Sequence, residues 1–382
     1  MKKLSLYIHI PFCVRKCHYC DFLSAPPREN EKKEYVEALC GEIRREAAAF
    51  GEYSVDTIFF GGGTPSLLEQ EELEKVMKAL QDGFIIEETA EITMEANPGT
   101  VDRKKLEGYR RLGINRLSIG LQSANDEELK ELGRIHGWET FLTTWKAVRE
   151  CGFTNVNIDL MSALPGQTIE SYTDTLKKIL ALEPEHISAY SLIIEEGTDF
   201  FDRFGPGKAE EDRLPSEEAD RTMYALTGKL LQEAGYSRYE ISNYSRPGRE
   251  CRHNLGYWTG KEYLGLGLGA SSLVGHTRFS RETNLETYLQ AAMAGESTVV
   301  WQQDLSSRDQ MEEFMFLGLR CTKGISAKEF RKRFSADISA VYGKQLHKLK
   351  SKGLITVDET GQIVLTSLGL DVSNQVFVEF LK

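Results

Sequence analysis

The sequence predicts an α/β protein built around a parallel sheet. Six short apolar segments alternate with segments of helical periodicity, and this alternation is typical of parallel strands joined by right-handed crossovers. The expected strands are residues 4–10, 55–60, 90–95, 115–121, 155–160 and 186–193. The expected helices are residues 31–50, 69–81, 102–112, 126–132, 138–150 and 169–182. Six such units fall short of the eight that close a full barrel.

Local signals justify several of these elements. Pro11 ends the first strand because proline has no amide hydrogen to give to a ladder. The helix over 31–50 has a stripe of apolar side chains about four residues apart. These side chains are Tyr35, Leu39, Ile43 and Ala47. Asp102 stands where the helix over 102–112 needs an N-cap, and aspartate is a favoured residue there.

Three cysteines follow the first expected strand in the pattern C-x3-C-x2-C, at Cys13, Cys17 and Cys20. This short spacing brings three sulfurs together, which indicates a metal site or an iron–sulfur cluster. Structural zinc sites usually pair two C-x2-C knuckles, but the other four cysteines are isolated, and His18 lies inside the loop. A [4Fe–4S] cluster normally takes four cysteines, so three would leave one iron with an open position. Zinc or plain thiols remain the alternatives.

Glycine and polar residues gather at the carboxyl ends of the expected strands, where parallel α/β folds bind ligands. Residues 61–63 are three glycines in a row, which would let a ligand approach the backbone; a plain tight turn is the alternative. The other residues near these ends are Thr64, Glu95, Gln122, Arg134 and Asp159. Singly, each could be a surface polar group. Their common position predicts contact with a cofactor or substrate.

The cysteine pattern, with Tyr19 before its last cysteine, resembles the radical S-adenosylmethionine (SAM) enzymes. This resemblance implies that the six units form a partial (β/α)6 barrel. It also implies that Cys13, Cys17 and Cys20 hold a [4Fe–4S] cluster whose open iron is chelated by SAM. The residues it assigns to SAM are Tyr7, Tyr19, Gly62, Gly63, Thr64, Glu95, Gln122, Arg134 and Asp159.

A second group of notable residues is the run Cys251-Arg252-His253-Asn254-Leu255-Gly256-Tyr257-Trp258. A neutral imidazole is a natural ligand of haem iron, and aromatic rings suit a flat macrocycle, although an internal packing cluster is the alternative. The motif His-Asn-x-x-Tyr-Trp resembles the haem chaperones within the oxygen-independent coproporphyrinogen III oxidase-like group. The resemblance implies that His253 binds haem, with Cys251 as the alternate ligand.

Three functions are compatible with the sequence. The first is a haem chaperone that binds a [4Fe–4S] cluster, SAM and haem, with haem-accepting apoproteins as partners. The second is a coproporphyrinogen III oxidase, and the third is a haem carrier without radical chemistry. The oxidases carry a further cysteine where this chain has Phe22, and an extended N-terminal segment where only six residues precede Tyr7. These departures favour the chaperone, so oxidase activity is not expected.

The expected domains are a radical SAM core over residues 1–235, an extension over 236–304 that carries the His253 motif, and a C-terminal domain over 305–382. Within them, the sequence predicts a loop over 195–213, a helix over 217–235 and a strand over 239–244. The C-terminal pattern is helical over 306–319, 326–334 and 339–352, with a hairpin over 353–365. Helices followed by a hairpin predict a small winged-helix-like α+β domain, for which a covering role is favoured over DNA binding.

Composition bounds the location and the partners. The chain has 382 residues, 41% of them hydrophobic, which suits a globular protein with a real core. A net charge of −11 argues against nucleic-acid binding. No apolar run approaches the roughly 20 residues that cross a bilayer, which leaves only peripheral membrane contact open. Seven unevenly spaced cysteines argue against a disulfide framework and predict a reducing, cytoplasmic environment.

Overall fold

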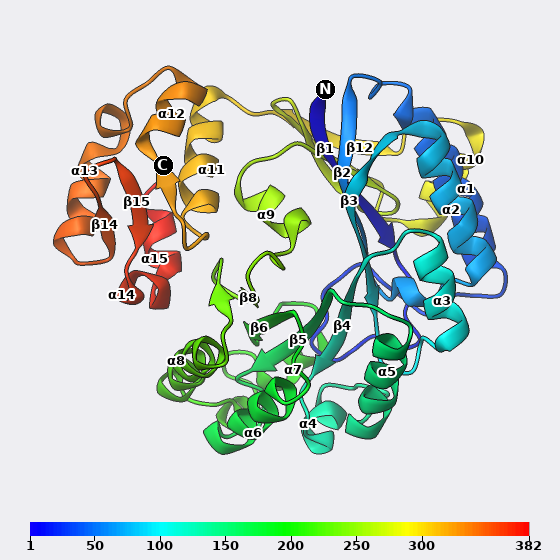
Figure 1. The fold of residues 1–382 in the computed structure, drawn as a ribbon, viewed down its shortest axis with the longest axis horizontal. Helices are drawn as coiled ribbons and strands as arrows, with labels where there is room; N and C mark the ends of the chain where they lie inside the picture. The colour runs from blue at the N-terminus through cyan, green and yellow to red at the C-terminus, as the bar shows by residue number, and fades with distance from the viewer. Residues whose placement is uncertain (382) are drawn as a thin grey trace.

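The computed structural model describes residues 1–381 and is organised around one 12-stranded sheet (Figure 1). The strand order is β12-β11-β10-β9-β1-β2-β3-β4-β5-β6-β8-β7, and β1 to β6 pair in parallel with their neighbours in chain order. These six strands are β1 (Lys2–Ile10), β2 (Tyr53–Gly62), β3 (Ile85–Ala96), β4 (Arg116–Gln122), β5 (Val156–Ser162) and β6 (His186–Ser191). The predicted parallel α/β core is confirmed.

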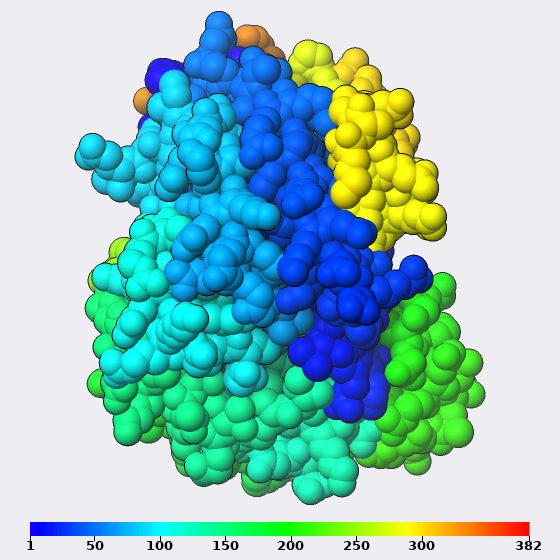
Figure 2. All heavy atoms as spheres, turned by 90° about the vertical axis from the view of Figure 1, so that its right-hand side faces the viewer, coloured from blue at the N-terminus to red at the C-terminus, as the bar shows by residue number. Residues whose placement is uncertain are grey.

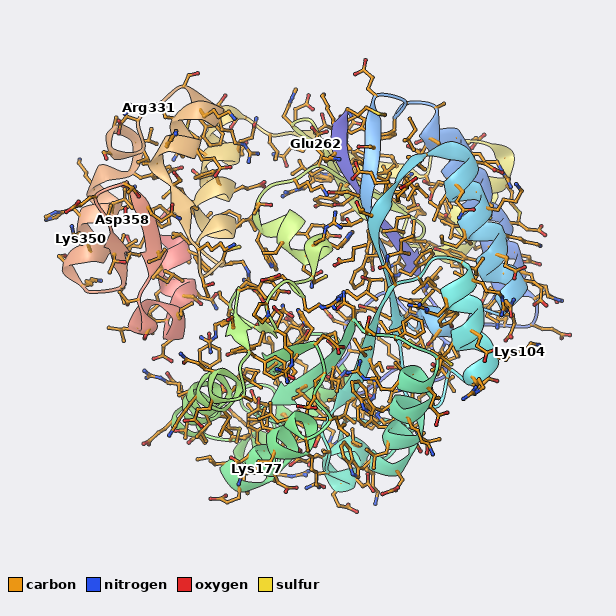
Figure 3. The ribbon with its side chains drawn as sticks, in the orientation of Figure 1. Lys104, Lys177, Glu262, Arg331, Lys350 and Asp358 are labelled. Carbon is orange, nitrogen blue, oxygen red and sulfur yellow. The ribbon has the colours of Figure 1, made fainter. Side chains whose placement is uncertain are left out.

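Helices follow the parallel strands and cover one face of the sheet (Figure 1). They are α1 (Glu31–Ala47), α2 (Gln70–Gly83), α3 (Arg103–Arg111), α4 (Asp126–Glu131), α5 (Trp138–Glu150), α6 (Ile169–Leu180) and α8 (Glu217–Glu233). The side chain of Asp102 accepts a hydrogen bond from the Lys105 amide, as its predicted N-cap role requires. Lys104 and Lys177 point outward from α3 and α6, so these helices turn a polar face to solvent (Figure 3).

The register of β1, β2 and β3 sorts their side chains between two faces. On β1, Leu4, Leu6 and Ile8 are fully buried in the hydrophobic core. The intervening residues lie on the opposite face, because successive side chains of a strand alternate. Ser5 pairs with Thr57, and Thr57 pairs with Glu91, so one row of that face is polar. The next row is Tyr7, Phe59 and Thr93.

The segment between the parallel core and the C-terminal domain extends the sheet at both ends, which the sequence did not predict. Its strands are β7 (Ser237–Arg238), β8 (Asn243–Ser245), β9 (Tyr263–Leu266), β10 (Ser271–Val274), β11 (Thr277–Arg281) and β12 (Val299–Asp304). Its helices are α9 (Arg252–Trp258) and α10 (Leu285–Ala294). Strand β9 pairs in parallel with β1, whereas β8 pairs antiparallel with β6. The division of the chain into domains at residues 235 and 304 stays a prediction.

The C-terminal domain is a separate α+β unit with its own hydrophobic core and a three-stranded antiparallel sheet. Its elements are α11 (Ser307–Gly318), β13 (Ile325–Ser326), α12 (Ala327–Phe334), α13 (Ile338–Ser351), β14 (Ile355–Val357), β15 (Gln362–Leu365), α14 (Ser367–Asp371) and α15 (Ser373–Val378). Helix α9 lies between this domain and the barrel (Figure 1). The Arg320 guanidinium stacks on the Trp258 ring at 4.3 Å and joins the two.

Two local predictions were wrong. Residues 195–213 are not only a loop, because they contain α7 (Asp199–Phe204) and the 3-10 turn η2 (Glu211–Arg213). Thr198 caps α7, and the buried rings of Phe200 and Phe204 hold it in a small apolar cluster. Of the predicted strand over 239–244, only Asn243 and Tyr244 belong to a strand, β8, and β7 ends before the segment begins. The Glu240 carboxylate accepts a hydrogen bond from the Ser242 amide and so stabilises a turn there.

A buried carboxylate ties the β9–β12 extension to the core. Glu42 of α1 and Arg281 of β11 are both fully buried, and Arg281 Nη1 lies 3.0 Å from a Glu42 oxygen. Glu42 also accepts hydrogen bonds from the Gly267 amide at 2.7 Å and the Tyr288 hydroxyl at 3.1 Å.

No helix within residues 1–381 is long and apolar enough to cross a membrane.

Glu42→Ala is expected to lower the free energy of unfolding by about 3 to 5 kcal/mol, because it removes the fully buried partner of Arg281, leaving only the partly exposed Glu46 carboxylate 3.3 Å away, and strands the Gly267 amide and the Tyr288 hydroxyl. Chemical denaturation measures the change, and Glu71→Ala on the exposed face of α2 is the control. A loss below about 1 kcal/mol for Glu42→Ala would show that this ion pair does not hold the extension in place.

Candidate functional site

A cavity of about 340 Å³ lies at the carboxyl ends of β2 to β6. The residues predicted to bind a cluster or SAM line it, except for Tyr7. They are Cys13, Cys17, Tyr19, Cys20, Gly62, Gly63, Thr64, Glu95, Gln122, Arg134 and Asp159. A larger groove lies between α8 and α14 and contains none of them. The residues that the sequence placed at separate strand ends therefore meet at one site.

Backbone hydrogen bonds fix the cysteine loop over this cavity. The Gly63 amide donates to the Ile10 carbonyl at 2.9 Å, and the Thr64 amide donates to the Phe12 carbonyl at 2.7 Å. On the other side, the Phe200 amide donates to the His18 carbonyl at 3.0 Å. Figure 2 shows the dark-blue N-terminal segment wedged between the cyan surface and a green segment of the chain. The loop is thus held by the strand ends and by α7.

Two of the three sulfurs have polar partners. Arg134 Nη1 lies 3.5 Å from Cys17 Sγ, and the Thr64 hydroxyl donates to Cys13 Sγ at 3.4 Å. Burial, followed by the neighbouring cysteines, raises the pKa of Cys20 to about 11, so a bound cation would have to draw off its proton. His18 directs Nδ1 to the Glu131 carbonyl at 3.1 Å.

The described part of the chain contains no group of three His, Cys, Asp or Glu side chains that converge as ligands of a single metal ion. Zinc takes its ligands at one atom in tetrahedral geometry, whereas in an iron–sulfur cluster each cysteine binds a separate iron atom. The two alternatives therefore require different geometries of Cys13, Cys17 and Cys20.

A network that includes Asn97 connects the SAM-side residues. Arg134 Nη2 donates to Asn97 Oδ1 at 2.6 Å and to the Gly120 carbonyl at 2.6 Å, and Asn97 Nδ2 donates to the Thr64 hydroxyl at 2.9 Å. Nothing in the sequence pointed to Asn97 except its position, two residues after Glu95 at the end of β3.

Glycine is required at the end of β2. Gly62 has φ +111°, and a Cβ atom there would lie 2.5 Å from the His9 ring. A Cβ on Gly63 would lie 2.7 Å from the Phe12 carbonyl oxygen. Gln122 adopts φ +76° although it is not a glycine, which is a strained conformation of the kind found at functional sites.

A second cavity of about 230 Å³ continues from the first toward the barrel interior, and Tyr7 lines it. Gly62, Glu95 and Asp159 line both cavities. The buried Arg116 also lines the inner one, and no sequence signal pointed to it, because it reads as an ordinary strand residue. Tyr7 is therefore near the other predicted residues, one step deeper in the barrel.

The two carboxyl groups of these cavities have raised pKa values. Burial, followed by repulsion from Asp159, raises the pKa of Glu95 to about 8. Burial likewise raises the pKa of Asp159, which accepts a hydrogen bond from Asn157 at 2.7 Å. The Arg116 guanidinium opposes both shifts but does not cancel them, so a positively charged ligand beside these two acids would stabilise their ionised forms.

His253, a residue of α9, lies outside both cavities, and its ring is fully buried between this helix and the sheet. Its Nδ1 is 3.0 Å from the Thr57 hydroxyl, and its Nε2 is 2.9 Å from the Tyr257 hydroxyl. Burial, followed by repulsion from Lys261 and Arg116, lowers its pKa to about 3, so the ring is neutral at pH 7. In this conformation both ring nitrogens already have partners.

Glu91 of β3 fixes the start of α9. Its carboxylate accepts hydrogen bonds from the Arg252 and His253 amides, both at 3.1 Å. Cys251 Sγ also lies 3.6 Å from Glu91, and burial raises the pKa of this thiol to about 12. The role of Glu91 could not be predicted, because nothing about a charged residue within an expected strand indicates contact with a helix 160 residues later.

Comparison with known proteins identifies the family. Residues 7–179 match the radical SAM superfamily, and residues 305–372 match the HemN C-terminal domain. The chain is 36% identical to the haem chaperone HemW of Bacillus subtilis over 99% of both chains. It belongs to the radical SAM superfamily. This superfamily implies a [4Fe–4S] cluster and SAM, and the resemblance seen in the sequence is confirmed.

Other relatives within the superfamily point to the same group. The haem chaperone HemW of Escherichia coli is 36% identical, with 96% of this chain and 97% of that one covered. The solved structure of coproporphyrinogen III oxidase (HemN) from Escherichia coli is similar with a TM-score of 0.87 and 27% identity. That comparison covers 99% of this chain and 90% of the HemN chain, so the radical SAM core and the C-terminal domain share one arrangement in both proteins.

The affinity for SAM is expected to rise with pH up to about pH 8. A cation bound beside Glu95 favours the ionised carboxylate, so below the pKa of about 8 binding must release a proton. The affinity should then increase by up to about tenfold per pH unit between about pH 6 and pH 8, as calorimetry in buffers of different ionisation enthalpy can measure. Glu95→Gln should remove this dependence. An affinity that falls as the pH rises would contradict the assignment.

Proposed function

We propose that this protein is a haem chaperone that holds a [4Fe–4S] cluster, SAM and haem and delivers haem to acceptor proteins. The observation that carries the proposal is the position of the His-Asn-x-x-Tyr-Trp motif. Helix α9 lies against the inner face of β1 to β3, the same strands that lead to the cysteine cavity. The identity with haem chaperones over the whole chain supports it. The proposal places the protein in the cytoplasm, with haem-accepting apoproteins as partners.

The cavity residues divide into cluster ligands and SAM contacts in this proposal. Cys13, Cys17 and Cys20 hold the cluster, which supplies an open iron position when bound. The SAM contacts are Tyr7, Tyr19, Gly62, Gly63, Thr64, Glu95, Gln122, Arg134 and Asp159. Three features support the division: a donor set of thiols, two glycines that line the cavity, and buried acids that favour a sulfonium or ammonium group.

His253 is a better candidate than Cys251 for the haem ligand. The Cys251 thiol has a pKa of about 12, because it is buried next to Glu91, so its thiolate is scarce at neutral pH. His253 is neutral, which is the form of imidazole that binds iron. The Tyr257 hydroxyl is hydrogen-bonded to His253 Nε2 and must move away before iron can bind this nitrogen.

A coproporphyrinogen III oxidase is the second candidate, favoured by the close structural match to HemN. Phe22 argues against it, because this residue lies on the wall of both cavities at the position where the oxidases have a further cysteine. Anaerobic reconstituted protein is therefore expected to leave coproporphyrinogen III unchanged in the presence of SAM and reductant. Formation of protoporphyrinogen IX, detected by chromatography, would establish the oxidase instead.

Cys17→Ser is expected to abolish the cluster, because a serine hydroxyl is a poor substitute for a thiolate on iron. Iron and sulfide analysis after anaerobic reconstitution measures the loss. Cys151→Ser is the matched control, since Cys151 is a half-exposed cysteine on the outer side of the barrel. A full complement of iron and sulfide in Cys17→Ser would refute the ligand assignment.

His253→Ala is expected to weaken haem binding by at least about tenfold while the cluster absorbance stays intact, because the iron loses its axial ligand. Titration with ferric haem, followed in the Soret band, measures the affinity. His347→Ala, an exposed histidine of α13, is the control. If His253→Ala binds haem as the unchanged protein does, the ligand lies elsewhere and Cys251 is the next residue to test. Transfer of the bound haem to an apo-cytochrome then tests the chaperone role itself.

A further inference from the structure

A chain of hydrogen bonds fixes the His253 ring from both sides. Thr57 of β2 is fully buried, and its hydroxyl lies 3.0 Å from His253 Nδ1. The same hydroxyl donates to the Ser5 hydroxyl of β1 at 2.8 Å. On the other side of the ring, the Tyr257 hydroxyl lies 2.9 Å from Nε2. The chain therefore runs from β1 through β2 to the last turn of α9.

The donors in this chain determine the tautomer of His253. A threonine hydroxyl has one hydrogen, and Thr57 uses it toward Ser5. Thr57 can then only accept from Nδ1, so Nδ1 carries the imidazole proton. A neutral imidazole has one proton, which leaves a lone pair on Nε2 for the Tyr257 O–H. The nitrogen that can bind a metal is thus Nε2, and a hydroxyl protects it.

Packing keeps the His253 ring in this orientation, whereas the Tyr257 side chain that covers Nε2 is less buried. The His253 ring stacks on Phe59 with a centroid distance of 5.1 Å, and Glu91 fixes the backbone beneath it. Tyr257 is only half-buried and meets Tyr263 edge-on at 4.7 Å. Of the two side chains, Tyr257 is the more exposed, so it is the one expected to move when Nε2 takes another partner.

We propose that Thr57 is a positioning residue that directs His253 Nε2 toward haem iron, and that the Tyr257 hydroxyl reserves this nitrogen until haem arrives. The inference rests on the proposed function, because it takes His253 as the iron ligand. On binding, Nε2 exchanges the Tyr257 hydroxyl for iron, and Tyr257 keeps its proton. Hydrogen bonds to the second nitrogen of metal-binding histidines generally fix the tautomer and increase the basicity of the ligand.

The first experiment needs no haem. Nitrogen-15 spectra of the full chain with labelled histidine report which ring nitrogen of His253 is protonated, with His253→Ala giving the assignment. The expected result is a neutral ring protonated at Nδ1 in the unchanged protein and in Thr57→Ser, and loss of this single tautomer in Thr57→Val. A ring protonated at Nε2 in the unchanged protein would overturn the proposal, whatever haem does.

The second experiment titrates the same variants with ferric haem. Thr57→Val should weaken binding by about tenfold to a hundredfold, the usual effect of removing such a partner, and Thr57→Ser should restore it. Tyr257→Phe should instead tighten binding about fivefold, because the free protein no longer holds a hydrogen bond that haem must break. In ferrous protein, the iron–histidine stretching frequency should fall in Thr57→Val, which a purely structural effect would not cause.

Thr93→Val is the matched control. Thr93 is a fully buried threonine on the neighbouring strand, and its hydroxyl has no partner among the described residues, so valine there should leave haem binding unchanged. Equal losses in Thr57→Val and Thr93→Val, or weaker binding in Tyr257→Phe, would overturn the inference. Absence of haem binding in the unchanged protein would instead refute the proposed function, so the two failures are distinguishable.

Discussion

The register of β1, β2 and β3 is the constraint on which the rest of the molecule depends. It places Ser5, Thr57 and Glu91 in one row across the sheet, and Glu91 and Thr57 in turn hold His253. The same three strands run on to the cysteine loop, the glycine turn and Glu95. A shift of one residue in any of them would turn these side chains toward the helices and would dismantle both regions together.

This arrangement places the inner cavity beside the His253 ring. Tyr7 lines the inner cavity with Glu95, and its ring lies 6.5 Å from that of His253. A ligand that displaces Tyr7 would therefore touch the packing of the histidine. Helix α9 also meets the C-terminal domain through Trp258 and Arg320, so movement of that domain would reach the same helix. Tyr7 thus connects the inner cavity with the packing around His253.

Much of the fold could be predicted from the sequence, because apolar periodicity and strand-end residues are local signals. The parallel core, its helices and the convergence of Gly63, Thr64 and Arg134 follow from such signals. The strands β9 to β12 could not be predicted in this way, since they are joined to the core by contacts between residues distant in the chain, such as the buried ion pair of Glu42 and Arg281. The roles of Thr57 and Glu91 were hidden for the same reason: a threonine and a glutamate in a strand acquire their partners only in the folded barrel.

The central claim is that the cluster and the haem ligand occupy the same barrel. The most direct test is electron paramagnetic resonance of haem-loaded protein in which both centres are reduced, so that high-spin ferrous haem, which is paramagnetic, and the reduced cluster are present together. Magnetic dipolar coupling to a nearby paramagnetic haem iron speeds the relaxation of a cluster spin. The relaxation of the cluster signal is therefore expected to become faster when haem is bound, and His253→Ala is expected to abolish this change. Signals that relax independently in the doubly loaded protein would contradict the account.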